Sequence, residues 1–84
     1  MDIPDMFTIT IECFGKEIDF SVPASFTVEE MKPYICKGLM IKLGRFFSED
    51  QIVLYAGNRR LPENVPAKIL GLFDGTFIKA VTDM

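Results

Sequence analysis

One predicted helix start constrains the fold of this chain more than any other feature. Thr27 is followed three residues later by Glu30, the spacing of a capping box, in which each side chain accepts a hydrogen bond from the other residue's backbone amide. Behind this start, apolar residues recur at helical spacing and form one stripe: Val28, Met31, Ile35 and Leu39. We therefore predict a helix that begins at Val28 and buries this stripe against a sheet.

The course and the end of this helix are less constrained by the sequence. Pro33 removes one helical hydrogen bond and crowds the preceding turn, so we expect either a kink or an irregular first turn. Two glycines, Gly38 and Gly44, are able to supply the left-handed residue that commonly ends a helix. The sequence leaves the choice between them open.

Strand patterns flank the helix on both sides. Residues 7–13 and 17–22 alternate apolar and polar side chains, and Phe14-Gly15 between them fits a tight turn, so we predict a hairpin. Residues 51–55 and 76–81 are the predicted third and last strands.

The segment between the last two predicted strands contains two prolines and reads as a loop that spans residues 61–70. We expect Leu72 and Phe73, which follow it, to fill part of the core. This order of elements predicts an α+β fold, the β-grasp, in which a mixed sheet wraps over one helix. The domain is expected to span residues 6–82, after a short flexible leader at residues 1–5.

The chain resembles ubiquitin and the ubiquitin-like domains over about residues 6–82. The resemblance is carried by the turn Gly15-Lys16, by the helix start at residues 27–29 and by the run at residues 50–58. Within that run, Tyr55-Ala56-Gly57 is close to the family's Phe-Ala-Gly. The resemblance implies the ubiquitin-like fold. It also exposes a departure, since conjugated relatives end in Gly-Gly and this chain has no glycine after Gly75. We therefore expect either a protein that is not conjugated or a piece of a longer chain.

Little in the composition points to catalysis or to a cofactor. The chain has 84 residues and no histidine, which excludes histidine-dependent nucleophiles and histidine metal ligands. Cys13 and Cys36 are expected to be reduced, buried and poorly reactive thiols. The acidic clusters at residues 29–30 and 48–50 are interpreted as capping or solvated groups, and Arg59-Arg60 as a solvated turn. We predict no enzyme activity and no cofactor.

The composition also narrows the classes of partner. The formal charge of −3 and the scattered basic residues give no sign of a nucleic-acid surface. No apolar run approaches the roughly 20 residues that span a bilayer, and the amino terminus does not have the pattern of a signal peptide. A cytoplasmic or nuclear protein without a nucleic-acid or membrane partner is the resulting expectation.

The strongest functional hint is a break in the alternation of the later strands. If Val53 and Tyr55 face the core, their neighbours on the third strand point outward, and the last strand points alternate residues outward as well. An exposed apolar patch usually marks a binding site. The predicted partner-binding residues are Phe14, Ile52, Leu54, Phe77, Lys79 and Val81.

The resemblance implies the same layout for this patch. The principal recognition surface of the family has a central isoleucine, which falls at Leu54, and a flanking valine, which falls at Val81. Its histidine position is taken by Lys79, and its turn leucine lies near Phe14.

The leading functional hypothesis is a non-conjugated interaction domain, monomeric when isolated. Its expected partner is a ubiquitin-recognition module, a proteasome subunit or another complex component. Two alternatives stay open: a protein modifier whose Gly-Gly tail lies outside this sequence, and a permanent subunit of a larger assembly.

Overall fold

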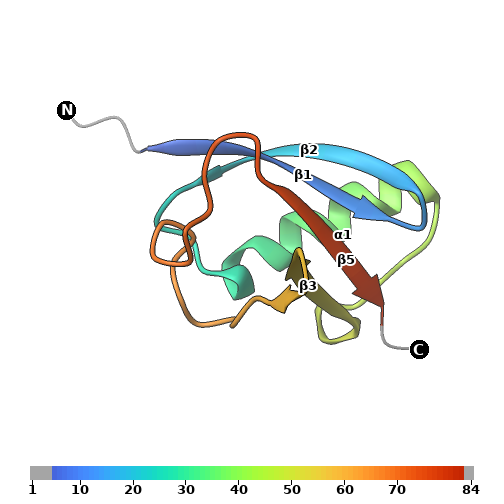
Figure 1. Cartoon of the computed structure of the whole chain (residues 1–84). Helices are drawn as coiled ribbons and strands as arrows, with labels where there is room; N and C mark the ends of the chain where they lie inside the picture. Colours follow the sequence, from blue (N-terminus) through green and yellow to red (C-terminus); the bar gives the residue numbers. More distant parts are fainter. Residues whose placement is uncertain (1–4, 83–84) are drawn as a thin grey trace.

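The computed structural model describes residues 5–82, which form one mixed sheet with a helix packed across one of its faces (Figure 1). In chain order the elements are β1 (Met6–Cys13), β2 (Lys16–Pro23), α1 (Val28–Leu43), the 3-10 helix η1 (Glu49–Gln51), β3 (Ile52–Ala56), β4 (Arg59–Arg60) and β5 (Phe77–Thr82). The predicted leader lies outside the described residues except for Asp5, whose carbonyl accepts a 2.7 Å hydrogen bond from the amide of Ala24.

The sheet has the strand order β2-β1-β5-β3-β4. The first and last strands, β1 and β5, are parallel neighbours near its centre, while β1 with β2, β3 with β5 and β3 with β4 pair antiparallel. The predicted α+β architecture is therefore confirmed: a mixed sheet covers one helix, and both ends of the chain supply central strands. Figure 1 shows β5 running beside β1, with α1 behind the sheet.

Helix α1 begins as its capping residues predict. The hydroxyl oxygen of Thr27 accepts a 3.2 Å hydrogen bond from the amide of Glu30, and the Glu30 carboxylate accepts a 3.0 Å bond from the amide of Thr27. The helix presents its apolar stripe to the sheet, and all four predicted residues of the stripe are buried. Local capping and helical periodicity thus place the same face inward.

The helix continues through Pro33 after a regular, capped first turn, so the alternative of an irregular first turn was wrong. Gly44 ends the helix in the left-handed conformation, with φ of 69°, and its amide donates a 2.9 Å hydrogen bond to the carbonyl of Met40. Gly38 has a different role, because a Cβ atom there would lie 2.6 Å from Cζ of Phe20. The missing side chain lets the ring on β2 lie against the helix.

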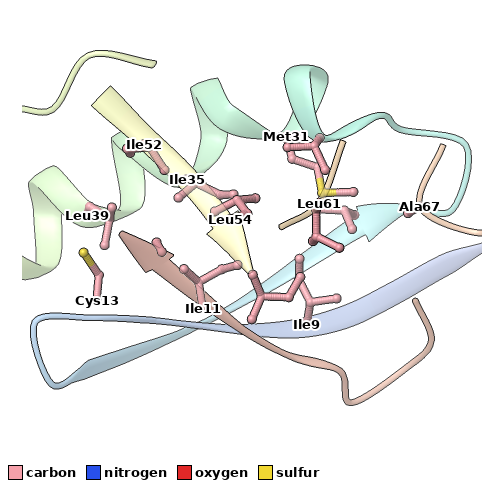
Figure 2. Close-up of a cluster of buried hydrophobic side chains, with 14 of the residues drawn as sticks. Ile9, Ile11, Cys13, Met31, Ile35, Leu39, Ile52, Leu54, Leu61 and Ala67 are labelled. Atoms are coloured by element: carbon pink, nitrogen blue, oxygen red, sulfur yellow. The ribbon is translucent and has the colours of Figure 1, made fainter. Parts of the chain in front are cut away.

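The core lies between α1 and the inner face of the sheet (Figure 2). Side chains from β1, β3 and the helix interdigitate there, and Leu61 and Ala67 close one end from the loop after β4. Leu72 is buried as predicted, whereas Phe73 is 63% exposed, so its assignment to the core was wrong. Leu72 takes the inward position, and the next side chain points to solvent.

Candidate protein-binding face of the sheet

The structure places β3 in the opposite register from the one predicted. Ile52 and Leu54 are 0% and 1% exposed and belong to the core, as Figure 2 shows, so their assignment to an exposed patch was wrong. Val53 and Tyr55, predicted to face the core, are half-buried and point to the other face of the sheet. Because successive side chains of a strand alternate between faces, this one-residue shift changes every position of the strand.

The hairpin between β3 and β4 gives the physical reason for this register. The two-residue turn Gly57-Asn58 pairs Tyr55 with Arg60, and the amide of Leu61 then donates a 2.9 Å bond to the carbonyl of Leu54. Directly opposed residues share a face of the sheet, so the buried Leu61, which follows β4 opposite Leu54, marks the inner face, and Tyr55 and Arg60 lie on the outer face.

This hairpin was the signal in the sequence that identifies the outward residues. In a two-residue hairpin at Gly57-Asn58, the apolar Leu61 falls opposite Leu54, so these two residues share the inner face, and Arg60 falls on the outer face with Tyr55. Arg59 and Arg60 form β4, so the prediction of a turn at these residues was wrong. Both side chains are exposed, as predicted.

The predicted orientation of β5 agrees with the structure. Ile78 and Ala80 are buried, while Phe77, Lys79 and Val81 are exposed on the outer face. The pairing of β3 with β5 sets outward residues against one another, Val53 against Val81 and Tyr55 against Lys79. We call the resulting surface the outer-face patch; its members are Val53, Tyr55, Phe77, Lys79 and Val81.

Phe14 lies beside one end of this patch. Its ring is 55% exposed and stacks on the ring of Phe47 with 6.0 Å between centroids. The guanidinium carbon of Arg45 lies 5.4 Å from the centroid of Phe14 and 5.3 Å from that of Phe47, within cation–π range. Phe14 also lines a shallow groove of about 300 Å³ with Lys79 and Val81. The fold thus brings four of the six predicted site residues to one region.

Charged residues on this face are separated by sign. Pairing across the sheet gives a row that runs Glu17, Glu12, Lys79, Tyr55 and Arg60 from β2 to β4. The acidic members lie on β1 and β2, and the basic members lie on β5 and β4. Sequence reasoning missed this order because it depends on the pairing of strands that are distant in the chain.

Cys13 is buried as predicted, whereas Cys36 is half-buried, so its assignment to the buried thiols was wrong. Both cysteines are free, and burial is the main factor that raises the pKa of Cys13 and of Cys36 above that of an ordinary thiol. Nearby carboxylates raise both values further, Glu12 beside Cys13 and Glu49 beside Cys36. A raised pKa leaves less thiolate at neutral pH and so lowers nucleophilic reactivity.

Other site chemistry is sparse within residues 5–82. These residues contain no group of three or more side chains arranged to hold a metal ion. No helix of this part of the chain is long and apolar enough to cross a membrane. On the outer-face patch, the exposed Phe77 and Val81 of β5 lie beside the half-buried Val53 and Tyr55 of β3.

Solved structures with the same arrangement identify the fold. Ubiquitin from Caldiarchaeum subterraneum superimposes with a TM-score of 0.79 at 22% identity, covering 95% of this chain and 96% of its own. The ubiquitin-like domain of Plasmodium falciparum Dsk2 gives a TM-score of 0.81 at 14% identity, covering 94% and 100%. This chain has the ubiquitin-like fold. A ubiquitin-like domain of an Arabidopsis thaliana protein agrees, with a TM-score of 0.75, 15% identity and coverage of 94% and 79%.

The ubiquitin-like assignment rests on structure rather than on sequence similarity. No protein-family model matches the chain, and no curated protein matches it. The resemblance of the Tyr55-Ala56-Gly57 run led to the correct fold but to the wrong register. In the structure, Tyr55 rather than Leu54 occupies the outward position at the centre of the sheet.

Proposed function

We propose that this chain is a ubiquitin-like interaction domain that binds protein partners non-covalently through the outer-face patch. One observation carries the proposal. The solvent-facing side of β3 and β5 exposes apolar side chains, with Phe77 51% and Val81 40% exposed. A contiguous exposed apolar surface usually marks an interaction site.

The partner-contacting residues in this proposal differ from those predicted from the sequence. Tyr55 replaces Leu54 as the central residue, and Val53 replaces Ile52 beside Val81. Phe77 and Tyr55 supply the large aromatic area on which binding hot spots often depend. Lys79, directly opposite Tyr55, adds a polar group that selects among partners.

The partner class follows the ubiquitin-like character of the domain. A ubiquitin-recognition module, a proteasome subunit or another component of a complex would present an apolar surface to Tyr55 and Phe77. The solved neighbours include ubiquitin itself and the ubiquitin-like domain of Dsk2, and this likeness supports a protein-recognition surface.

Affinity capture with matched variants tests the proposal. Tyr55→Asp should remove partners that the wild-type domain captures, whereas Phe46→Asp should retain them. Phe46 is a suitable control because it is 78% exposed and lies in the connection after α1, outside the outer-face patch. Loss of the same partners from both variants, or from neither, would contradict binding through the outer-face patch.

The strength of the interaction provides a second measurement. Truncating a binding hot spot costs about 2 kcal/mol or more, so Tyr55→Ala should weaken a captured partner at least about thirtyfold. The melting temperature of the isolated domain should change little by comparison. Adducts of this chain that survive denaturation would instead indicate a protein modifier.

A further inference from the structure

A second apolar surface, the helix groove, lies on the side of the domain away from the outer-face patch. Helix α1 covers the inner face of the sheet (Figure 1), and its solvent side forms one wall of the groove with Pro33, Lys37 and Met40. Residues 46–49, which follow the helix, form the other wall. The groove has a volume of about 380 Å³, within the range of protein binding pockets.

The two walls expose large apolar side chains that the core does not use. Phe46 is 78% exposed and Met40 is 47% exposed, while the neighbouring Phe47 is buried and holds its segment against the domain. Phenylalanine and methionine are enriched where proteins bind one another, and methionine adapts its shape to a partner. The helix groove is therefore a candidate interaction surface that is distinct from the outer-face patch.

Two charges of opposite sign lie in the same groove. Lys37 is on the helix wall, Glu49 is on the facing wall, and both side chains are exposed. Within residues 5–82 the ion pair joins Lys32 to Glu63, so in this part of the chain neither Lys37 nor Glu49 is paired. The best partner for this groove presents an acid to Lys37 and a base to Glu49.

A second copy of the domain supplies both groups at once. Rotation by half a turn about an axis through the groove exchanges its two walls, so residues 46–49 of one copy face the helix of the other. Glu49 then meets Lys37 of the second copy, and Phe46 meets the apolar part of that copy's helix wall. In a twofold arrangement each of these contacts forms twice.

We propose that the helix groove is a self-association site through which two copies of this domain form a twofold dimer. Eight residues line the groove, whereas a standard interface uses about 20–30 on each side, so the dimer should be weak and dissociate on dilution. The outer-face patch of each copy would stay free, because α1 and the patch lie on opposite faces of the sheet. Two free patches in one dimer would allow bivalent binding of a repeated partner.

The paired charges favour a second copy over other occupants. An uncharged apolar ligand would leave Lys37 and Glu49 without partners. A uniformly acidic or basic surface would be attracted by one of these charges and repelled by the other.

Sedimentation of the isolated domain tests for the dimer. Between about 10 μM and about 1 mM the wild type should shift from monomer toward dimer, since association depends on protein concentration. Lys37→Glu and Glu49→Lys should each weaken the association at least about tenfold, because each places like charges together twice. Phe46→Asp should weaken it too, with little change in melting temperature, because this side chain is exposed.

Mixing the two charge variants gives the sharpest measurement. Lys37→Glu mixed with Glu49→Lys should associate at least about tenfold more tightly than either variant alone, because both contacts of the mixed pair then join opposite charges. A mixture of Lys68→Glu and Glu17→Lys is the matched control. It makes the same changes of charge at exposed positions outside the groove and should associate as the wild type does.

The outcomes separate the dimer from the proposed function. A wild-type domain that stays monomeric at about 1 mM would overturn the dimer, and so would a mixed pair no tighter than its components. Tyr55→Asp should leave self-association unchanged. If it abolishes self-association, the copies meet through the outer-face patch and the groove is the wrong site. Partner capture that depends on Tyr55 would support the proposed function whether or not the dimer forms.

Discussion

The amide of Leu61 donates a 2.9 Å hydrogen bond to the carbonyl of Leu54, and both leucine side chains are buried in the core. This contact joins β3 to the residue just after β4 and sets which face of β3 meets solvent. Tyr55, one position on, is therefore directed to the outer face opposite Lys79.

Truncating Leu54 should destabilise the domain more than truncating Val53. The orientation predicted from the sequence, with Val53 inward and Leu54 outward, would have given the reverse. Leu54→Ala removes a 1% exposed side chain and should lower the free energy of unfolding by about 2–5 kcal/mol. Val53→Ala, at a half-buried position, should cost about 1 kcal/mol. Chemical denaturation of both variants measures the difference, and a larger loss at Val53 would show that the register described here is incorrect.

The capping box of α1 should make a measurable contribution to stability. Thr27→Ala removes the hydroxyl that accepts from the amide of Glu30 and should cost about 1 kcal/mol. Thr27→Ser keeps an oxygen at the cap and serves as the control. Equal melting temperatures for the alanine and serine variants would mean that the cap contributes little.

The contact between Gly38 and Phe20 should reverse the usual effect of a glycine-to-alanine change in a helix. Alanine normally favours a helix by about 1 kcal/mol over glycine, but a Cβ at Gly38 would overlap the Phe20 ring and should cost about 1–3 kcal/mol. We expect Gly38→Ala to destabilise the wild-type domain and to stabilise the Phe20→Leu variant.

A double-mutant cycle over these two positions isolates the contact. Independent effects of the two substitutions would show that the ring moves aside without cost.

The ion pair between Lys32 and Glu63 should make stability depend on pH in the acid range. Lys32 is buried in the helix, and its hydrogen bond to Glu63 is the main factor that lowers the pKa of the Glu63 carboxyl below its ordinary value; the positive charge of Lys32 adds to this effect. A carboxyl whose pKa is lower in the folded protein stabilises the fold at pH values above its pKa in the unfolded chain, which is about 4.3 for glutamate. This stabilisation disappears as the pH falls through the pKa of the carboxyl in the folded protein.

Glu63→Gln should therefore have a lower melting temperature than the wild type at pH 7, and the two should converge below about pH 4. Thermal denaturation from pH 7 to pH 3 checks this expectation. Glu49→Gln, an exposed acid for which no ion pair is seen within residues 5–82, is the control. If the melting temperatures of Glu63→Gln and the wild type differ by the same amount from pH 7 to pH 3, the ionised Glu63 carboxylate is not the cause of the difference.

Much of the fold follows from local patterns in the sequence. The capping pair Thr27 and Glu30, the helical stripe and the alternation of the first two strands each depend on residues close together in the chain. Hydrogen bonds at a helix end and the periodicities of 3.6 and 2 residues act over short distances, so the chain specifies them without reference to distant segments. The outward position of Lys79 was likewise determined by the cost of burying its charge.

The orientation of the proposed binding face was decided only by the tertiary structure. All five residues of β3, Ile52–Ala56, are apolar or aromatic, so the strand has no polar position that marks its solvent side. The pairing of Tyr55 with Lys79 and Arg60, and of Leu54 with Ala80, supplies that information from other strands. A shift of one residue exchanges the core and surface faces of a strand, and for this strand the chemistry of its partners selects the register.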